Sequence, residues 1–403
     1  MDNETKSTGT WVLGAGFAGI QAAKAILRRS RETTLVLVDR NTCSTMIPAL
    51  PDVLSGRVLR SAISRPVPEV FPASLRSRLD FRRGTVTAVD LDARTLIMDG
   101  VVHAWDTLVI ATGSVPEYYG FTPDAPMHSV HSLEHAEALR RDFEARAPGL
   151  GAQAVPVIIV GAGYTGLEVA ASLRRGAGAA GFPQPEITVV EQAEEILPFL
   201  PERQRRHIRA YLQSLDVRIR TGTSLTSFDG HRARLSDGTE VEGALVCWAA
   251  GMSSSAIAVS GRVDHTRDGR IRTDETLQVP GYPRVFVAGD AAAIEKGGVL
   301  QRRAVNFAYY SGRRAGRNAA GVIRENASRG PSPPRKFFPL DLGWIIPLGG
   351  TSVGLVFGIF RVRGTLGLRM HYAMCGFRHF GVREALEFFK TALHLGRTPD
   401  PPR

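Results

Sequence analysis

The sequence predicts an α/β fold with two Rossmann-like dinucleotide-binding domains, followed by a C-terminal region made of a β-hairpin plus an amphipathic helix. Three observations predict it. Two similar glycine-rich turns each follow an apolar strand and precede a helix. An acidic residue ends the next apolar strand after each turn. Near the end of the chain, an alternating apolar stretch is followed by a segment with helical spacing.

Length and composition are those of an ordinary folded protein. With 403 residues the chain can form two or three domains, and 43% of the residues are hydrophobic and 22% charged. The formal net charge is +11, and a basic surface favours anionic partners such as nucleotides or acidic lipids. No nucleic-acid-binding motif is present. The polar N-terminus has no apolar signal region, so we expect a cytoplasmic protein.

The first glycine turn lies in the stretch "WVLGAGFAGI", where Gly14, Gly16 and Gly19 lead into a predicted helix. The first glycine permits the tight turn, the second lets a pyrophosphate approach the backbone, and the third lets helix and strand pack closely. The start of the helix then offers free N–H groups to phosphates. The strand "TTLVLVD" ends in Asp39, 20 residues after Gly19, where a carboxylate can accept both ribose hydroxyls.

The second turn repeats this arrangement in "VIIVGAGYTGLEV", with Gly161, Gly163 and Gly166. The strand "EITVVE" ends in Glu191, 25 residues after Gly166, and the loop "RGAGAAGFPQP" accounts for the extra length. An acid at this position repels a 2′-phosphate and therefore favours NADH over NADPH. For both acids the alternative is a solvated strand end. Two dinucleotide sites in one chain indicate one bound cofactor and one exchanging partner, as in a flavin enzyme that oxidises a reduced nicotinamide.

Three further apolar strands end in small residues. "DTLVIATGS" ends in Ala111, Thr112 and Gly113, "LVCWAAG" ends in Ala250 and Gly251, and "PRVFVAGDAA" reaches Gly289 and Asp290. Asp290 could accept hydrogen bonds from a ribityl chain or cap the helix that follows it.

These segments and the paired turns resemble the two-dinucleotide-binding flavoproteins, and most closely the type II NADH dehydrogenases, the single-subunit NADH:quinone oxidoreductases. Apoptosis-inducing-factor-like flavoproteins are near relatives. The resemblance covers nearly the whole chain. It includes "ATGSVPEYYG", the linker helix "SLEHAEALRRDF", and the hairpin with its amphipathic tail after residue 335.

The resemblance implies four segments. Residues 1–117 form the first part of an FAD-binding domain, and 118–282 form an NAD(H)-binding domain that includes the linker helix. Residues 283–332 complete the FAD-binding domain. Residues 333–403 form the C-terminal hairpin and helix, which contact a membrane or a second copy of the chain.

The resemblance also implies binding residues for FAD and for NADH as co-substrate. The FAD residues are Gly14, Ala15, Gly16, Phe17, Ala18, Gly19, Asp39, Arg40, Val86, Ala111, Thr112, Gly113, Gly289 and Asp290. The NADH residues are Gly161, Gly163, Tyr164, Thr165, Gly166, Glu168, Glu191, Ala250 and Gly251. Glu168 matches an acid near the nicotinamide end, and the alternative is a first-turn helix acid favoured by the dipole. Hydride transfer needs alignment rather than a protein acid or base, so no catalytic side chain is predicted.

The chain departs from this family before and within the helix after Asp290. The family has an Ala-Gln…Gln-Gln-Gly pattern beside the quinone site, whereas Asn306, Tyr310 and Ser311 replace the three amides here. Tyr310 could stack on an aromatic acceptor or pack in the core. Arg302 and Arg303 replace the usual proline-rich approach and could hold an anionic acceptor or a flavin phosphate, or form a solvated basic loop. The acceptor-site candidates are Arg302, Arg303, Asn306 and Tyr310.

The cysteines Cys43, Cys247 and Cys375 are far apart, so we expect no metal site and no dithiol redox centre. The superfamily's disulfide reductases carry two cysteines where this chain has only Cys43, which we interpret as an ordinary loop residue rather than a redox residue.

The stretch 342–360 is apolar but contains a proline and several glycines, so it predicts a β-hairpin with "PLGGTS" as its turn rather than a membrane span. Residues 382–397 have apolar side chains at helical spacing and mixed charges on the other face. This helix could lie in the interface of the inner face of the cell membrane, or dock on the protein or on a partner in a homodimer.

Three functions fit the sequence. The first is an FAD enzyme that passes hydride from NADH to FAD and then electrons to a quinone or quinone-like acceptor. The second keeps the NADH half but uses a soluble aromatic acceptor, as in a pathway-specific oxidoreductase. The third is an NADH-binding redox sensor, as the apoptosis-inducing-factor-like proteins suggest.

Overall fold

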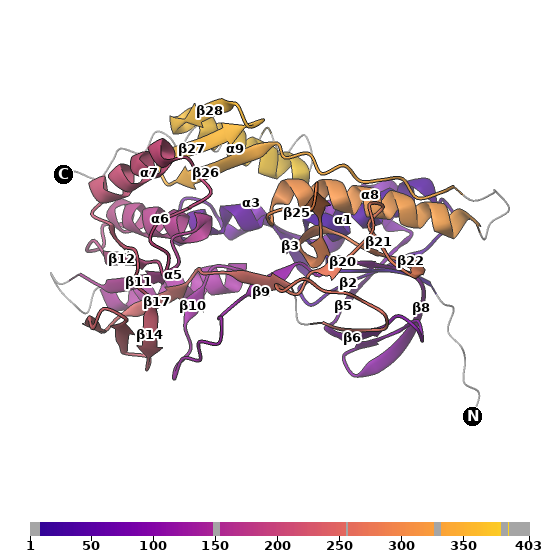
Figure 1. The fold of residues 1–403 in the computed structure, drawn as a ribbon, viewed down its shortest axis with the longest axis horizontal. Coiled ribbons are helices and arrows are strands. Elements are labelled where there is room, and N and C mark those ends of the chain that lie inside the picture. Colours follow the sequence, from indigo (N-terminus) through magenta and orange to yellow (C-terminus); the bar gives the residue numbers. More distant parts are fainter. Residues whose placement is uncertain (1–8, 148–153, 255–256, 326–331, 380–385, 387–403) are drawn as a thin grey trace. The chain divides into compact units, whose positions relative to one another are not determined.

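The computed structural model describes residues 9–147, 154–254, 257–325, 332–379 and 386 (Figure 1). The chain folds into two compact units. Unit 1 comprises residues 1–44, 64–115 and 252–341, and unit 2 comprises residues 45–63, 116–251 and 342–403. The chain passes between the units several times, so each unit is assembled from segments that are distant in the sequence.

Unit 1 is built on a parallel sheet in the order β22-β8-β1-β2-β5. Its central strands are apolar runs buried on both faces, as expected for a parallel sheet covered by helices. The five strands are β1 (Gly9–Leu13), β2 (Leu35–Asp39), β5 (Leu79–Arg83), β8 (Val101–Ile110) and β22 (Tyr282–Val287).

Strand β8 is long enough to pair with different strands along its two halves. Its first half pairs antiparallel with β7 (Thr95–Met98), and its second half pairs parallel with β1. β7 pairs with β6 (Val86–Asp90), and β6 pairs with β19 (Ala258–Ser260). The remaining elements of unit 1 are β3 (Cys43–Thr45), which ends at the unit boundary, β4 (Ser64–Pro66), η2 (Val67–Val70), α4 (Ala73–Arg76), β9 (Ser114–Pro116), which also reaches the boundary, β18 (Met252–Ser254), β20 (Ile271–Arg272), β21 (Gln278–Val279), η4 (Gly289–Ala291), β23 (Ala292–Ala293), β24 (Glu295–Lys296) and β25 (Val299–Leu300).

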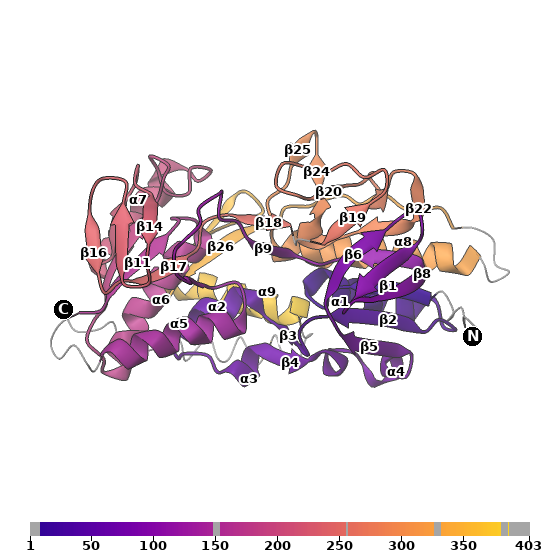
Figure 2. The same cartoon turned by 90° about the horizontal axis from the view of Figure 1, so that it is seen from below.

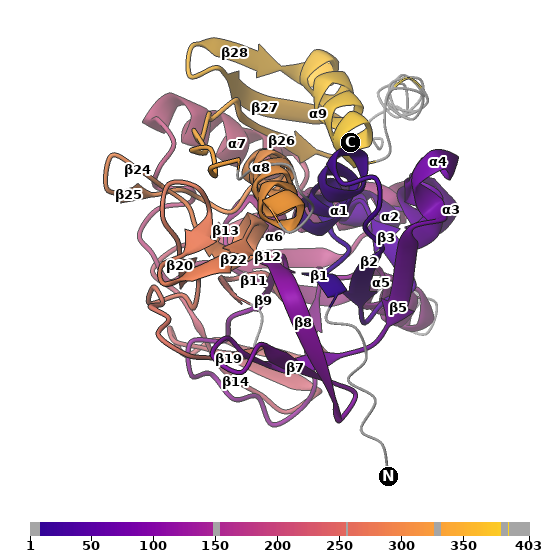
Figure 3. The ribbon, with the colours of Figure 1, turned by 90° about the vertical axis from the view of Figure 1, so that its right-hand side faces the viewer.

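Two helices of unit 1, α1 (Phe17–Arg29) and α8 (Val305–Glu325), lie side by side (Figure 3). Small residues allow their backbones to approach. A Cβ added to Gly312 would lie 2.1 Å from the backbone oxygen of Ala18, and one added to Gly316 would lie 2.3 Å from that of Ala22. Both glycines are therefore required by close packing, which fixes the axial position of α8 on α1.

Unit 2 contains a second parallel sheet, in the order β10-β17-β11-β12-β13. A three-stranded antiparallel sheet packs its buried residues against Trp248 and Val160 of this sheet. The strands of both sheets are β10 (His128–Ser129), β11 (Pro156–Val160), β12 (Glu186–Val190), β13 (Arg218–Arg220), β14 (Leu225–Phe228), β15 (Arg232–Leu235), β16 (Glu240–Glu242) and β17 (Leu245–Trp248).

Helices α5 (Leu133–Arg146), α6 (Tyr164–Ala180) and α7 (Glu202–Ser214) complete the core of unit 2. The short helix α2 (Leu50–Leu54) packs against both α5 and α6 (Figure 2). A Cβ on Gly176 would lie 2.5 Å from the Cα of Ser55, so only glycine lets α6 approach the end of α2. The neighbouring η1 (Ile47–Ala49) and α3 (Arg60–Ile63) flank α2 in the chain.

The predicted hairpin is present. Strands β26 (Gly343–Leu348) and β27 (Thr351–Val356) pair antiparallel around Gly349 and Gly350, and β28 (Phe360–Arg363) extends the sheet. Helix α9 (Gly364–His379) follows. The predicted amphipathic helix at 382–397 lies outside the described residues except for Leu386. Among the described residues, no helix is both long and apolar enough to cross a membrane.

The boundaries of the two units differ from the boundaries of the four predicted segments. Residues 252–282 lie in unit 1 because their strands pair there: β19 with β6, β20 with β23, and β21 with β22. Residues 45–63 and 342–403 lie in unit 2. Which cofactor each predicted segment binds stays a prediction at this point.

Candidate functional site

The carboxyl ends of four parallel strands of unit 1 meet at one edge of its sheet. Gly14 follows β1, Asp39 ends β2, Ala111 follows β8 and Gly289 follows β22. Since these strands pair directly with one another in parallel, the four predicted segments lie together in space. Ligands of open α/β sheets bind at this edge.

The three glycines of the first turn have the distinct roles that the motif predicts. Gly14 has a φ of 97°, and a Cβ there would lie 2.3 Å from the carbonyl oxygen of Ala111. A Cβ on Gly19 would lie 1.7 Å from the carbonyl oxygen of Gly14. By contrast, a Cβ on Gly16 would meet nothing within 4 Å. The middle glycine therefore faces open space, which is the room that a pyrophosphate needs.

Asp39 is tied to this turn rather than being a free strand end. Its Oδ2 accepts a hydrogen bond from the N–H of Ala15 at 2.7 Å, and its Oδ1 accepts one from the N–H of Asn41 at 2.8 Å. The carbonyl oxygen of Asp39 accepts from the N–H of Gly84 at 3.0 Å, which brings the segment before Val86 to the same strand end. Arg40 follows and receives the Arg83 guanidinium on its carbonyl oxygen.

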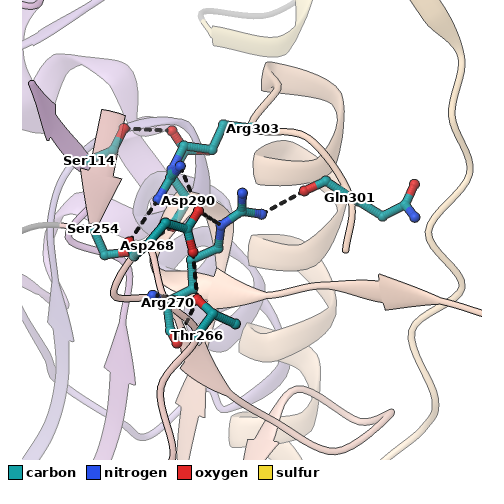
Figure 4. A network of polar contacts seen from close by, with 8 residues as sticks. All are labelled: Ser114, Ser254, Thr266, Asp268, Arg270, Asp290, Gln301 and Arg303. Carbon is teal, nitrogen blue, oxygen red and sulfur yellow. Dashed lines mark hydrogen bonds and ion pairs between the residues drawn. The ribbon is translucent and has the colours of Figure 1, made fainter. Parts of the chain in front are cut away.

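Asp290 does not cap a helix, contrary to one of the two readings of the sequence. It lies within the 3-10 turn η4, and its carboxylate accepts a hydrogen bond from the hydroxyl of Ser114 at 2.9 Å (Figure 4). Its backbone oxygen accepts from Ser254. Burial raises the pKa of Asp290, while the Ser114 bond opposes that shift.

Figure 4 shows a polar network beside Asp290 that the sequence did not predict. Arg303 pairs with Asp268 at 2.9 Å, and Arg270 pairs with the same carboxylate at 2.8 Å. The Nε atom of Arg303 is buried without a hydrogen-bond partner in the described part of the chain. The Arg303 side chain is only 15% exposed and is paired with Asp268, so it is not part of a solvated loop. Burial lowers the pKa of Arg303, as does the charge of Arg270.

The second turn, in unit 2, repeats the geometry of the first. Gly161 has a φ of 102°, a Cβ on Gly166 would lie 1.9 Å from the carbonyl oxygen of Gly161, and a Cβ on Gly163 would meet nothing within 4 Å. Glu191 accepts hydrogen bonds from the N–H of Ala162 at 2.8 Å and of Ala193 at 3.0 Å. This acid is therefore also tied to its turn.

The residues after β17 close the same edge of the unit 2 sheet. β17 pairs parallel with β11, and a Cβ on Gly161 would lie 2.8 Å from the Cα of Ala250. Gly251 has a φ of 67°, which favours glycine. Tyr164 and Thr165 begin α6, directly after the open Gly163.

Glu168 is the fifth residue of α6, and the first turn of this helix carries no acid, so the first-turn interpretation of Glu168 is wrong. Burial, and then the neighbouring Asp52 carboxyl, raise the pKa of Glu168 well above its usual value. A dipole effect at a helix N-terminus would lower the pKa instead. We therefore expect Glu168 to hold its proton at higher pH than an exposed glutamate.

Asp52 belongs to a buried group that sequence reasoning missed. It lies in α2, accepts a short hydrogen bond from the hydroxyl of Tyr372 in α9, and pairs with Arg57 at 3.7 Å. Burial is the largest influence on Asp52 and raises its pKa; it also raises the pKa of Tyr372. An aspartate within the apolar run "MIPALPDVL" was the available signal, whereas nothing in the sequence pointed to Tyr372.

The four acceptor-site candidates all lie in unit 1 but make different contacts. Arg302 makes a two-bond ion pair with Asp341, with Nη2 to Oδ1 at 3.0 Å. Asn306 is buried and donates to the carbonyl oxygen of Leu340 at 2.6 Å. Tyr310 is 39% exposed, so it does not pack in the core. Arg302 and Asn306 thus hold the segment before β26, and Arg303 faces Asp268.

The three cysteines are free in the structure. Cys43 forms no disulfide with another described cysteine, and its sulfur accepts a weak hydrogen bond from the Thr42 hydroxyl at 3.8 Å. Burial raises the pKa of both Cys247 and Cys375 to about 12. These two thiols are therefore unreactive at neutral pH.

The chain is similar in sequence to known proteins. The family model for pyridine nucleotide-disulphide oxidoreductases matches residues 9–313. The type II NADH:quinone oxidoreductase Ndh of Mycobacterium tuberculosis is 30% identical over 361 residues, which cover 82% of this chain and 76% of that protein. The type II NADH:quinone oxidoreductase of Staphylococcus aureus is 25% identical over 374 residues, covering 86% and 89%.

Solved structures show the same fold. The structure of NDH2 from Plasmodium falciparum in complex with NADH has a TM-score of 0.79 at 13% identity and covers 98% of this chain and 99% of that one. The sulfide:quinone oxidoreductase from Aquifex aeolicus has a TM-score of 0.75 at 17% identity, covering 98% and 96%.

The raised pKa of Glu168 predicts a pH-dependent effect of Glu168→Gln. A carboxyl whose pKa is higher in the folded than in the unfolded state costs stability as the pH rises above the unfolded value of 4.5, until the folded pKa is passed. The glutamine variant lacks this cost. We expect its free energy of unfolding to exceed that of the unmodified protein at neutral pH, and to show no gain below pH 4.5.

The measurement is denaturant unfolding at both pH values. The matched control is Glu202→Gln, which changes an exposed acid in the first turn of α7 and should be close to neutral at either pH. A gain of equal size at both pH values, or a loss at neutral pH, would contradict the expectation.

Proposed function

The chain belongs to the pyridine nucleotide-disulphide oxidoreductase family and, within it, to the type II NADH:quinone oxidoreductases, and on this basis we propose that it is an FAD-dependent enzyme that oxidises NADH and reduces a quinone. The observation that carries the proposal is the duplicated turn. Each unit presents a middle glycine to open space and an acid at the end of the next strand. Two such sites suit one resident and one exchanging dinucleotide.

Unit 1 is the proposed FAD site. Gly16 gives a pyrophosphate access to the N–H groups that begin α1, since no side chain caps that helix. Asp39 is held by two backbone N–H groups in a position to accept ribose hydroxyls. Asp290, Ser114 and the unpartnered Nε of Arg303 supply further polar groups at the same edge of the sheet.

The remaining residues assigned to FAD line the same strand ends. Gly113 has a φ of 72° and a Cβ there would meet nothing within 4 Å, so the backbone after β8 is open to a ligand. Val86 begins β6 next to the Asp39 strand end. The other proposed FAD residues are Ala15, Phe17, Ala18, Arg40, Ala111, Thr112 and Gly289.

Unit 2 is the proposed NADH site. Gly163 opens the start of α6 to the pyrophosphate, and Glu191 accepts ribose hydroxyls while repelling a 2′-phosphate. FAD held by unit 1 would supply the hydride-accepting and electron-transferring chemistry. The task of the chain is to bind and align, and we assign no catalytic acid or base. Glu168 lies in the second turn of α6, and burial and the Asp52 carboxyl raise its pKa.

The departures from the family bear on the acceptor rather than on the donor half. The side-chain amide of Asn306 donates to the carbonyl oxygen of Leu340 and so holds a neighbouring segment in place. Tyr310 is exposed and offers a ring to an aromatic molecule. This exposure favours a soluble aromatic acceptor as the second candidate function, and an acceptor comparison separates the two.

We also propose that the protein attaches peripherally to a membrane through the C-terminal segment after α9, as the sequence pattern at 382–397 favours. Alternatively, this segment contacts a second copy of the chain in a homodimer.

The acceptor prediction concerns steady-state turnover. With excess NADH we expect FAD-loaded enzyme to reduce menaquinone or ubiquinone analogues with many turnovers, at rates well above those with soluble aromatic oxidants. Absorbance of NADH and of the flavin is followed by stopped flow. Rapid reduction of the flavin without turnover on any quinone would overturn the quinone assignment, and a lasting NADH–flavin complex without turnover would favour a sensor.

The donor prediction concerns Glu191→Gln. The carboxylate charge is removed while one oxygen remains to accept from the N–H of Ala162. We expect the ratio of kcat/KM for NADH over NADPH to fall by about tenfold, since repulsion of the 2′-phosphate is lost. Glu194→Gln, at an exposed position three residues further on, serves as the control. A native preference for NADPH would contradict the role of Glu191.

The tail prediction concerns deletion of residues 380–403, which leaves α9 intact. We expect the deleted protein to float less well than the full-length protein with vesicles of phosphatidylcholine alone, while its NADH oxidation in solution persists. Equal flotation of both proteins would count against membrane attachment by the tail. A change from dimer to monomer in sedimentation, without a change in flotation, would favour the homodimer role.

A further inference from the structure

The exposed side of α8 carries three arginines close to the acceptor-site candidate Tyr310. Arg313 and Arg314 lie three and four residues after Tyr310, and Arg317 lies four and three residues after them, so the four side chains share one face of the helix. The opposite face is buried, through residues such as Ala315 and Ala319. The arginines thus lie on the side of α8 that points away from the core of unit 1.

An extended segment of unit 1, residues 335–341, runs along the same helix (Figure 1). Two asparagines of α8 hold it. Asn318 accepts from the N–H of Arg335 at 3.0 Å and donates to its carbonyl oxygen at 2.9 Å, and Asn306 donates to the carbonyl oxygen of Leu340 at 2.6 Å. The two asparagines are 12 positions apart, about three turns of helix, so the segment is fixed along that length.

Five arginines from three elements gather here. Arg29 ends α1, which packs on α8; Arg313, Arg314 and Arg317 lie on α8; and Arg335 lies on the bound segment. We call this group the basic face. Burial, and then the charges of Arg335, Arg29 and Arg313, lower the pKa of Arg314. Arg317 responds in the same way to burial and to the other four arginines. The five charges are therefore close enough to repel one another.

Within the described residues, no carboxylate pairs with any of these five arginines. Other basic side chains of unit 1 are matched: Arg302 with Asp341, Arg303 and Arg270 with Asp268, and Lys336 with Glu275. Clustered like charges destabilise a fold. The basic face is thus not accounted for by the folding of unit 1, and its charge suits an anionic partner.

Exposed apolar side chains accompany the charges. Phe338 is 78% exposed and Leu340 is 62% exposed, both on the segment that lies along α8. Tyr310 is exposed on the helix itself. A free phosphate or a nucleic-acid backbone would form no apolar contact with an exposed leucine and phenylalanine. The boundary between lipid headgroups and acyl chains accepts both the apolar side chains and the arginines around them.

We propose that the basic face docks unit 1 on the anionic headgroups of a lipid bilayer, with Phe338 and Leu340 inserted at the headgroup boundary. This contact is formed by α1, α8 and the segment 335–341, and does not rest on the C-terminal tail. The arginines supply long-range attraction that salt screens, and the two apolar side chains supply contact that salt does not weaken.

The test uses the full-length, FAD-loaded protein and co-sedimentation with vesicles of phosphatidylcholine alone or mixed with phosphatidylglycerol. We expect the double variant Arg313→Ser, Arg317→Ser to bind the mixed vesicles at least about tenfold more weakly. Its thermal stability should be unchanged or higher, since repulsion is relieved. The charge-matched control is Arg203→Ser, Arg206→Ser on α7, which should bind as the unmodified protein does.

A second variant, Phe338→Ser, should lower the vesicle binding that remains at raised salt while leaving the salt dependence itself in place. Unchanged binding of the arginine variant to mixed vesicles would overturn the proposal. So would binding of the unmodified protein to a single-stranded RNA with no binding to vesicles, which would assign the face to nucleic acid. Oxidation of NADH by a water-soluble quinone in the absence of vesicles separates this outcome from failure of the proposed enzyme activity.

Discussion

The structure depends on one hydrogen bond that occurs once in each unit. The carboxylate at the end of a strand accepts the N–H of the residue after the first glycine of the turn: Asp39 from Ala15 at 2.7 Å, and Glu191 from Ala162 at 2.8 Å. This bond fixes the turn to the neighbouring strand. The middle glycine then faces open space, and the helix start stays uncapped by any side chain. The turn is thus already formed without a ligand, and such preorganisation would lower the entropy lost when the proposed dinucleotide binds.

The contact between α1 and α8 has consequences beyond packing. Gly312 and Gly316 bring α8 onto the backbone of α1, which turns Asn306 and Asn318 toward the segment 335–341 and Tyr310 toward solvent. The same geometry collects Arg29 beside the arginines of α8. Asn306, which replaces one of the family's amides, therefore anchors a neighbouring segment, and the arginines further along α8 form the basic face.

Unit 2 concentrates its buried charge near the start of α6. Asp52, Tyr372 and Arg57 are brought together by α2, α9 and the residues after α2, and Asp52 raises the pKa of Glu168. Burying Asp52 and half-burying Glu168 cost stability, and strongly perturbed carboxyl groups are common at functional sites. The position of Glu168, five residues into the helix that follows the open Gly163, places this cost next to the proposed nicotinamide site.

Local signals in the sequence determined the strands, the two glycine turns with Asp39 and Glu191, and the hairpin around Gly349, because each depends on neighbouring residues and on a backbone geometry that glycine allows. The pairing of residues 252–282 with unit 1, the bond from Tyr372 to Asp52, and the alignment of Arg335 with α8 join residues far apart in the chain. No periodicity records such contacts, since they arise only when separate elements pack. The exposure of Tyr310 and the partial burial of Glu168 were likewise decided by packing, which sets the pKa of an acid and the side of a helix that meets solvent.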